Sequence, residues 1–117
     1  MRLKASAKAY DALYAKLEAG EIKLSPAQSG ELNGLLQGME QSLTQARGLP
    51  GREWFKHLIY APGMLTGYGV KTLPGVRESI ESNQWNVANE YSAVTASALN
   101  AYCARLDRAT AVLRKGL

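Results

Sequence analysis

The sequence predicts an all-α fold, a four-helix bundle with one long glycine-rich connection between the second and the last long helix. Apolar residues recur in steps of three and four along most of the chain, which places them on one face of a helix. No glycine or proline occurs from residue 84 to residue 114. Residues 57–75, in contrast, hold four glycines and two prolines, and these interrupt a helix.

The first helix is predicted within the segment LKASAKAYDALYAKLEAG, which begins at Leu3. Its apolar residues fall on one face, whereas most of its charged residues fall elsewhere. Members of this face are Leu3, Ala7, Tyr10, Leu13, Tyr14 and Leu17. Gly20 follows the last of them and is a plausible stop, because glycine readily takes the left-handed conformation that ends many helices.

The second helix is predicted to begin at Ser25-Pro26 and to end near Arg47-Gly48. Serine is a good N-cap, and proline suits the first helical position because its missing N–H would be unpaired there. Leucine and methionine then follow at helical spacing, at Leu32, Leu35, Leu36, Met39 and Leu43. Gly34 and Gly38 lie four residues apart inside this segment, so we expect another element to cross closely there.

The connection after the second helix begins at the breaker Leu49-Pro50-Gly51. A short apolar cluster follows at Trp54, Phe55, Leu58, Ile59 and Tyr60, and it is too brief to distinguish a strand from a helical turn. The glycine-rich loop comes next. Pro74-Gly75 then opens a short predicted helix from Val76 to about Ser82.

The last helix is predicted from Gln84 to Arg114. Its apolar seam repeats over about four heptads, which corresponds to a length of roughly 45 Å. The seam comprises Trp85, Ala88, Ser92, Thr95, Leu99, Tyr102, Leu106, Ala109 and Leu113. The bundle is predicted to pack through Leu13, Leu17, Leu35, Leu36, Leu99, Tyr102 and Leu106.

No charged residue occurs between Glu90 and Arg105 on any side of this helix. A helix that packs on one partner normally keeps a charged outer face. The uncharged stretch therefore predicts contact with a second domain or a second subunit. The alternative is that its serine, threonine and asparagine side chains simply face water.

Composition limits the chemistry that this chain can perform alone. At 117 residues and 46% hydrophobic, it fits one domain, 1–117, with a real core. The net charge of +4 is spread along the chain, which does not favour nucleic-acid binding. The only histidine is His57 and the only cysteine is Cys103, so neither a metal site nor a catalytic residue is predicted. We expect Cys103 to be buried. The charged residues near the N-terminus give a segment that does not resemble a signal peptide or a membrane-spanning helix.

The glycine-rich loop does not match a phosphate-binding motif. That motif requires glycine directly before Lys-Ser/Thr, but Val70 separates Gly69 from Lys71. A dinucleotide fingerprint fails as well, because no strand–helix–strand unit follows. Two interpretations remain: the glycines fold a long connection tightly, or the loop contacts a ligand that belongs to a neighbouring domain.

A combination of short segments resembles a known family. WFKHLIYAP is followed by GYG, then TLPGVRESIE, then a tryptophan that opens a long alanine-rich helix. This order resembles the C-terminal helical domain, the transferrin receptor-like dimerisation domain, of the glutamate carboxypeptidase and transferrin receptor family. The resemblance is strongest over Leu49–Glu81 and extends across nearly the whole chain.

The resemblance implies that the domain was excised from a larger chain. In the family it follows a zinc-dependent aminopeptidase-like domain and a protease-associated domain, and it makes much of the homodimer contact. The zinc ligands and the catalytic glutamate lie upstream, so zinc is expected in the missing peptidase domain and no cofactor in this chain. No hydrolysis is expected from this chain alone.

The resemblance also implies a substrate-binding loop. In the peptidases a Lys-Tyr pair on the glycine-rich loop holds the substrate's C-terminal carboxylates. Tyr68 matches the tyrosine, whereas Gly67 stands where the lysine would be, which puts a preference for glutamate in doubt. Lys71 is a candidate replacement charge, and the alternative for Tyr68 is a packing residue that holds the loop. His57 matches a family histidine that is not a zinc ligand and is interpreted as structural.

The predicted function is therefore the dimerisation domain of a glutamate carboxypeptidase-like zinc peptidase, with a loop that contributes to the substrate pocket. The expected partners of the domain are a second copy of the chain and the upstream peptidase domain. The domain is expected to contact neither nucleic acid nor a membrane. The parent is expected to be exported or to be a membrane-anchored ectodomain. The alternative is a receptor-type domain that binds a protein after peptidase activity has been lost, and a free-standing helical protein is a third possibility.

Overall fold

The computed structural model describes residues 1–65 and 69–117, which form two compact units. The first unit contains Met1–Ser42 and Asn100–Leu117, and the second contains Leu43–Leu99. Residues 85–99 of the last helix belong to the second unit and residues 100–114 to the first. Four α-helices and a small two-stranded sheet are present in the described residues. Packing of all four helices in one bundle stays a prediction.

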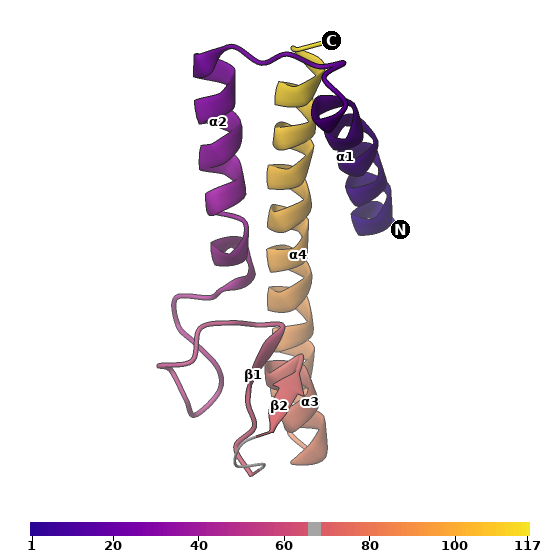
Figure 1. Cartoon of the computed structure of the whole chain (residues 1–117). Coiled ribbons are helices and arrows are strands. Elements are labelled where there is room, and N and C mark those ends of the chain that lie inside the picture. Colours follow the sequence, from indigo (N-terminus) through magenta and orange to yellow (C-terminus); the bar gives the residue numbers. More distant parts are fainter. Residues whose placement is uncertain (66–68) are drawn as a thin grey trace. The chain divides into compact units, whose positions relative to one another are not determined.

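The first unit is built from α1 (Arg2–Glu18), α2 (Pro26–Gln37) and the C-terminal half of α4 (Trp85–Arg114). In Figure 1, α1 and α2 lie on either side of that half of α4. Their apolar faces meet around a buried cluster of Leu32, Ala109, Val112 and Leu113. Partly buried residues pack against this cluster, namely Tyr10, Leu13, Leu17, Leu24, Leu35 and Leu36.

The predicted start of α2 is confirmed. Ser25 is its N-cap, and the Ser25 hydroxyl accepts a hydrogen bond from the backbone N–H of Gln28 at 3.2 Å. The Gln28 side chain accepts in return from the Ser25 N–H at 2.9 Å, which completes a capping box. Pro26 occupies the first helical position.

The predicted end of α2 is wrong. The helix stops at Gln37 rather than near Arg47, and a short 3₁₀ helix, η1 (Glu40–Leu43), follows. Gly38 caps the helix, and the side chain of Arg105 lies directly against it. A Cβ built on Gly38 would lie 2.2 Å from a nitrogen of the Arg105 guanidinium, so a side chain of α4 lies against this glycine, whereas a close crossing of the two helices stays a prediction. Gly34 does not share this contact, because nothing lies within 4 Å of its Cβ position.

The second unit contains the sheet and the short helix. Strands β1 (Tyr60–Pro62) and β2 (Val70–Thr72) pair antiparallel, with Ala61 opposite Lys71. Helix α3 (Pro74–Glu81) follows, and the N-terminal half of α4 completes the unit (Figure 1). The sequence did not distinguish a strand from a helical turn for the apolar cluster of residues 54–60. In the structure, the last residue of this cluster, Tyr60, begins strand β1. The unit's buried core is Leu49, Leu58, Ala61, Tyr91 and Ala98.

In the first half of α4, the predicted seam is correct at Ala88 and Thr95, which are buried, and wrong at Trp85 and Ser92. Trp85 is 57% exposed and Ser92 is exposed, whereas Tyr91 and Ala98 are buried in their place. From Leu106 onward the predicted seam is correct, with Leu106, Ala109 and Leu113 all buried. Leu99 and Tyr102 are only half-buried, as are the four predicted core leucines of α1 and α2. The predicted burial of Cys103 is confirmed.

Candidate functional site

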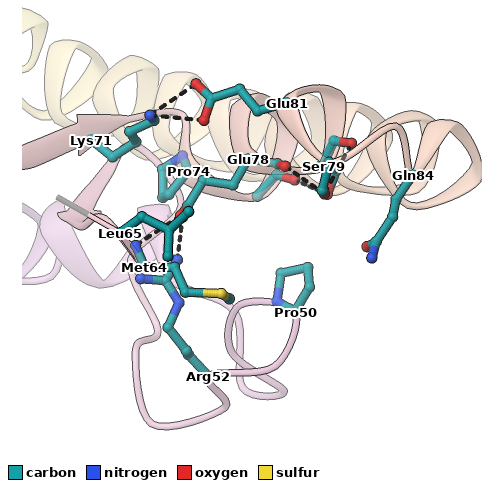
Figure 2. Close-up of a pocket in the computed structure, with 12 residues that line it drawn as sticks. Pro50, Arg52, Met64, Leu65, Lys71, Pro74, Glu78, Ser79, Glu81 and Gln84 are labelled. Atoms are coloured by element: carbon teal, nitrogen blue, oxygen red, sulfur yellow. Dashed lines mark hydrogen bonds and ion pairs between the residues drawn. The ribbon is translucent and has the colours of Figure 1, made fainter.

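The candidate site is a pocket of about 240 Å³ in the second unit, beside the glycine-rich loop (Figure 2). Its walls come from the loop before β1, from the loop residues after β1, from β2 and from α3. The lining residues are Pro50, Arg52, Met64, Leu65, Lys71, Pro74, Gly75, Glu78, Ser79, Glu81, Ser82 and Gln84. Proline, methionine and leucine supply the apolar part of this surface. The polar part comes from Glu78, Ser79 and Glu81 of α3 and from Arg52, Lys71, Ser82 and Gln84.

A buried ion pair between Arg52 and Glu78 forms one wall of the pocket. Arg52 is 7% exposed, and its guanidinium donates hydrogen bonds to the Glu78 carboxylate and, at 2.5 Å, to the carbonyl oxygen of Pro62. The second carboxylate oxygen of Glu78 accepts from the backbone N–H of Met64 at 2.8 Å. The ion pair therefore forms hydrogen bonds with the backbone on both sides of Gly63, where the glycine-rich loop begins.

A second ion pair joins β2 to α3. Lys71 Nζ lies 2.8 Å and 2.9 Å from the two carboxylate oxygens of Glu81. One turn earlier on α3, Arg77 donates a hydrogen bond to the hydroxyl oxygen of Thr72 at 3.1 Å. Figure 2 shows Lys71 and Glu81 facing each other across the rim of the pocket. The two cations and two carboxylates of the lining thus neutralise one another.

The turn into α3 carries backbone strain. Leu73 has φ 46° and ψ 54°, the left-handed conformation that a non-glycine residue adopts at a cost of about 1–2 kcal/mol. Its N–H donates to the carbonyl oxygen of Ile59 at 2.7 Å, and its own carbonyl accepts from Val76 and Arg77 in the first turn of α3. Gly75 allows α3 to approach Tyr91, because a Cβ there would lie 2.5 Å from the tyrosine ring. The start of α3 is therefore fixed from several sides.

The predicted substrate-binding residues are only partly described. Gly67 and Tyr68 lie outside the described residues. Lys71 lines the pocket, but its ammonium group is paired with Glu81. Sequence reasoning missed Arg52 and Glu78, because 26 positions separate them and no local pattern marks an arginine that will be buried.

Among the described residues, no group of three His, Cys, Asp or Glu could hold a metal ion. His57 Nδ1 accepts from the backbone N–H groups of Ile59 and Tyr60, and Cys103 is buried in the other unit. The described residues therefore do not fit a zinc site. No helix among them is long and apolar enough to cross a membrane.

The described residues form a mostly helical fold with one short antiparallel hairpin. The chain belongs to the transferrin receptor-like dimerisation domain family, whose model matches residues 1–107. This membership confirms the resemblance inferred from the motifs between Leu49 and Glu81.

Relatives of the chain are much longer proteins. A probable glutamate carboxypeptidase of Arthroderma benhamiae is 40% identical over 60 residues, which cover 51% of this chain and 8% of that protein. A probable glutamate carboxypeptidase of Arabidopsis thaliana is 46% identical over 52 residues, 44% of this chain and 8% of that protein. An inactive zinc metalloprotease of Schizosaccharomyces pombe is 44% identical over 43 residues, 37% of this chain and 5% of that protein. The chain is thus a dimerisation domain of the type found in glutamate carboxypeptidase-like proteins.

Proposed function

We propose that this chain is the dimerisation domain of a glutamate carboxypeptidase-like zinc peptidase and that its glycine-rich loop contributes to the substrate pocket of the parent enzyme. The family match over residues 1–107 carries the proposal. The names of the relatives support a peptidase parent. The pocket beside the loop supports a ligand-binding role, since it combines an apolar wall with charged groups.

Substrate contact is assigned to Tyr68, Gly67 and Lys71. The tyrosine hydroxyl offers a hydrogen bond to a substrate carboxylate, whereas Gly67 offers only its backbone. The Lys71 ammonium lies 2.8 Å from the Glu81 carboxylate. It can bind a substrate carboxylate only together with Glu81 or after this ion pair breaks. A C-terminal glutamate is therefore held less strongly here than by a lysine free of such a partner.

The zinc of the proposed parent would be held by residues outside this chain, because the described residues supply no suitable ligand group. We assign no catalytic residue to the chain. Its contribution is to shape one side of the substrate pocket and to join two subunits.

The proposed dimer contact is the uncharged face of α4. Four exposed residues of its N-terminal half, within the second unit, carry no charge: Ser92, Ala93, Ala96 and Ser97. Their small side chains recur at spacings of three and four, so a second helix can approach closely. A charge placed in the centre of such a contact would be desolvated without a partner, which is costly.

Two experiments on the natural full-length protein test the proposal. The full-length protein is expected to hydrolyse a peptide that ends in glutamate, and Tyr68→Phe is expected to raise the KM for that peptide. The 117-residue chain alone is expected to show no hydrolysis. Sedimentation velocity is expected to show a dimer that Ala96→Glu dissociates. Ala111→Glu, exposed on the same helix but outside the uncharged stretch, is the matched control. If the dimer persists in Ala96→Glu, the dimer contact is not this face of α4.

The second candidate is a receptor-type domain that binds a protein partner after the loss of peptidase activity. Two observations favour it: the relative named as an inactive zinc metalloprotease, and glycine at position 67. A full-length protein that dimerises but neither binds zinc nor hydrolyses the peptide would establish this alternative.

A further inference from the structure

We propose that the Arg52–Glu78 ion pair is a positioning pair, which holds the N-terminal stem of the glycine-rich loop in the geometry that the pocket requires. Its effect on substrate rests on the proposed function, whereas its effect on the loop does not. We define the N-terminal stem as residues 62–65 and the C-terminal stem as residues 69–72.

The first step concerns the guanidinium of Arg52. It bonds the carbonyl oxygen of Pro62, the last residue of β1, and the carboxylate of Glu78 on α3. The Arg52 and Glu78 side chains are only 9% and 18% exposed, so solvent screens this pair weakly. Arg52 thereby joins the end of β1 to α3.

The second step concerns the other oxygen of Glu78. It accepts from the backbone N–H of Met64 at 2.8 Å. Pro62 and Met64 are therefore fixed by one ion pair, while the N–H of Gly63 between them donates to the carbonyl oxygen of Gly69 at 3.3 Å. Every residue from 62 to 64 thus has a backbone group in a hydrogen bond.

The third step concerns the C-terminal stem. Glu81 and Arg77 of α3 bond Lys71 and Thr72 of β2. Side chains from adjacent turns of α3 therefore hold both stems. The Lys71–Glu81 pair is the more exposed of the two, with Glu81 52% exposed, so it holds its stem less rigidly.

The buried pair is better explained by positioning than by stability. A buried ion pair is often no more stabilising than apolar residues of similar volume, because both charges must be desolvated. Arg52 Nε is buried without a hydrogen-bond partner among the described residues, which adds to that cost. Apolar side chains could neither donate to the Pro62 carbonyl nor accept from the Met64 N–H. The ion pair therefore fixes a backbone path that apolar packing would leave free.

The test compares Glu78→Gln with the unchanged full-length protein by hydrogen exchange and by steady-state kinetics. We expect the amides of residues 63–65 to exchange at least about 10-fold faster, because Met64 loses a charged acceptor. For a peptide that ends in glutamate, we expect KM to rise about 5-fold or more with kcat nearly unchanged, because the loop binds substrate and does not react. A merely structural role would lower the melting temperature without separating KM from kcat.

Two further variants complete the design. Glu31→Gln removes an exposed surface pair with Lys115 in the other unit and is expected to change neither readout. Glu81→Gln releases Lys71 and is expected to accelerate exchange in the C-terminal stem only. Because Glu81 is half exposed, Glu81→Gln is expected to fold. If Glu78→Gln does not fold, Glu81→Gln still tests whether α3 holds a stem of the loop.

The outcomes separate the two proposals. Unchanged exchange of residues 63–65 in folded Glu78→Gln overturns the positioning role of the Arg52–Glu78 pair. Unchanged exchange of residues 69–72 in Glu81→Gln overturns the hold of α3 on the C-terminal stem. Faster exchange with unchanged KM sustains the positioning role and counts against a substrate-binding loop. Faster exchange with raised KM supports both.

Discussion

Arg105 donates a hydrogen bond from Nε to the carbonyl oxygen of Leu35 at 2.6 Å, across 70 positions of sequence. Its Nη2 atom donates to the carbonyl oxygen of Gly34 at 2.9 Å. Both carbonyls lie in the last turn of α2, where the helix itself supplies no N–H partner. The cation is also favoured at this end by the helix dipole. Arg105 therefore caps α2 and fixes where it ends.

The two glycines of α2 are expected to respond to alanine with opposite signs. Gly34→Ala should stabilise the protein by about 0.5–1 kcal/mol, because open space surrounds its Cβ position and alanine is the better helix former. Gly38→Ala should destabilise it by about 1–2 kcal/mol, because its Cβ would displace the guanidinium of Arg105 and break the cap. Urea unfolding of each variant measures the difference, and changes of the same sign would contradict this account.

Tyr91→Phe is expected to destabilise the protein by about 1–2 kcal/mol. The buried Tyr91 hydroxyl donates to the carbonyl oxygen of Gly48 at 2.7 Å, and phenylalanine would leave that carbonyl unpaired. Gly48 has φ +74° and no room for a Cβ, so the turn cannot shift easily to find another donor. Chemical denaturation provides the measurement. Tyr14→Phe is the control, because Tyr14 is 38% exposed, and an equal loss in both variants would rule out the buried bond as the cause.

Local signals in the sequence were sufficient to predict the helix starts. The Ser25 cap and the prolines at positions 26 and 74 act through their immediate neighbours. The end of α2 was missed because leucine spacing continues to Leu43, whereas the cap comes from Arg105 in a distant part of the chain. No local pattern reveals a partner of that kind.

The hairpin and the pocket depend on distant partners as well. Each strand has three residues, which is too few for an alternating pattern to be recognised. From the sequence alone, Arg52 would be taken for an exposed surface residue. Only the structure shows that it is paired with Glu78 and the Pro62 carbonyl. Lys71 was proposed as a replacement charge because it lies close in sequence to Gly67, where the resembling family has its lysine. Its pairing with Glu81 required the structure.

Tyr10 is expected to make the folded state sensitive to alkaline pH. Burial, followed by the nearby Tyr14 and Asp11, raises the pKa of Tyr10 above its ordinary value of 10.0. The folded state therefore favours the neutral phenol. The resulting stability is fully present below pH 10.0 and is lost as pH rises through the folded-state pKa. Tyr10→Phe should remove this part of the alkaline loss, which unfolding curves at neutral and alkaline pH would reveal.

Parallel curves for the two proteins across that range would contradict the shift in Tyr10. Tyr14→Phe serves as a second comparison, because its ring stacks on Tyr10 at 5.7 Å and its ionised form is one source of the shift. It should reduce the alkaline effect without abolishing it.

His57 is expected to act as a backbone hydrogen-bond acceptor. Its Nδ1 atom accepts from the N–H of Ile59 at 3.2 Å and from that of Tyr60 at 3.4 Å, at the point where β1 begins. Asparagine offers an acceptor oxygen that commonly bonds the N–H two residues later, whereas leucine offers none. His57→Leu should therefore cost about 1–2 kcal/mol of folding free energy, and His57→Asn clearly less.

Urea unfolding, together with exchange of the Ile59 amide, distinguishes the acceptor from the ring. The imidazole also stacks on Tyr60, with ring centroids 4.1 Å apart, and both variants remove that contact. If the acceptor matters most, the Ile59 amide stays protected in His57→Asn and exchanges rapidly in His57→Leu. Equal destabilisation and equal exchange in the two variants would instead assign the role of His57 to stacking, because only the lost ring is common to both.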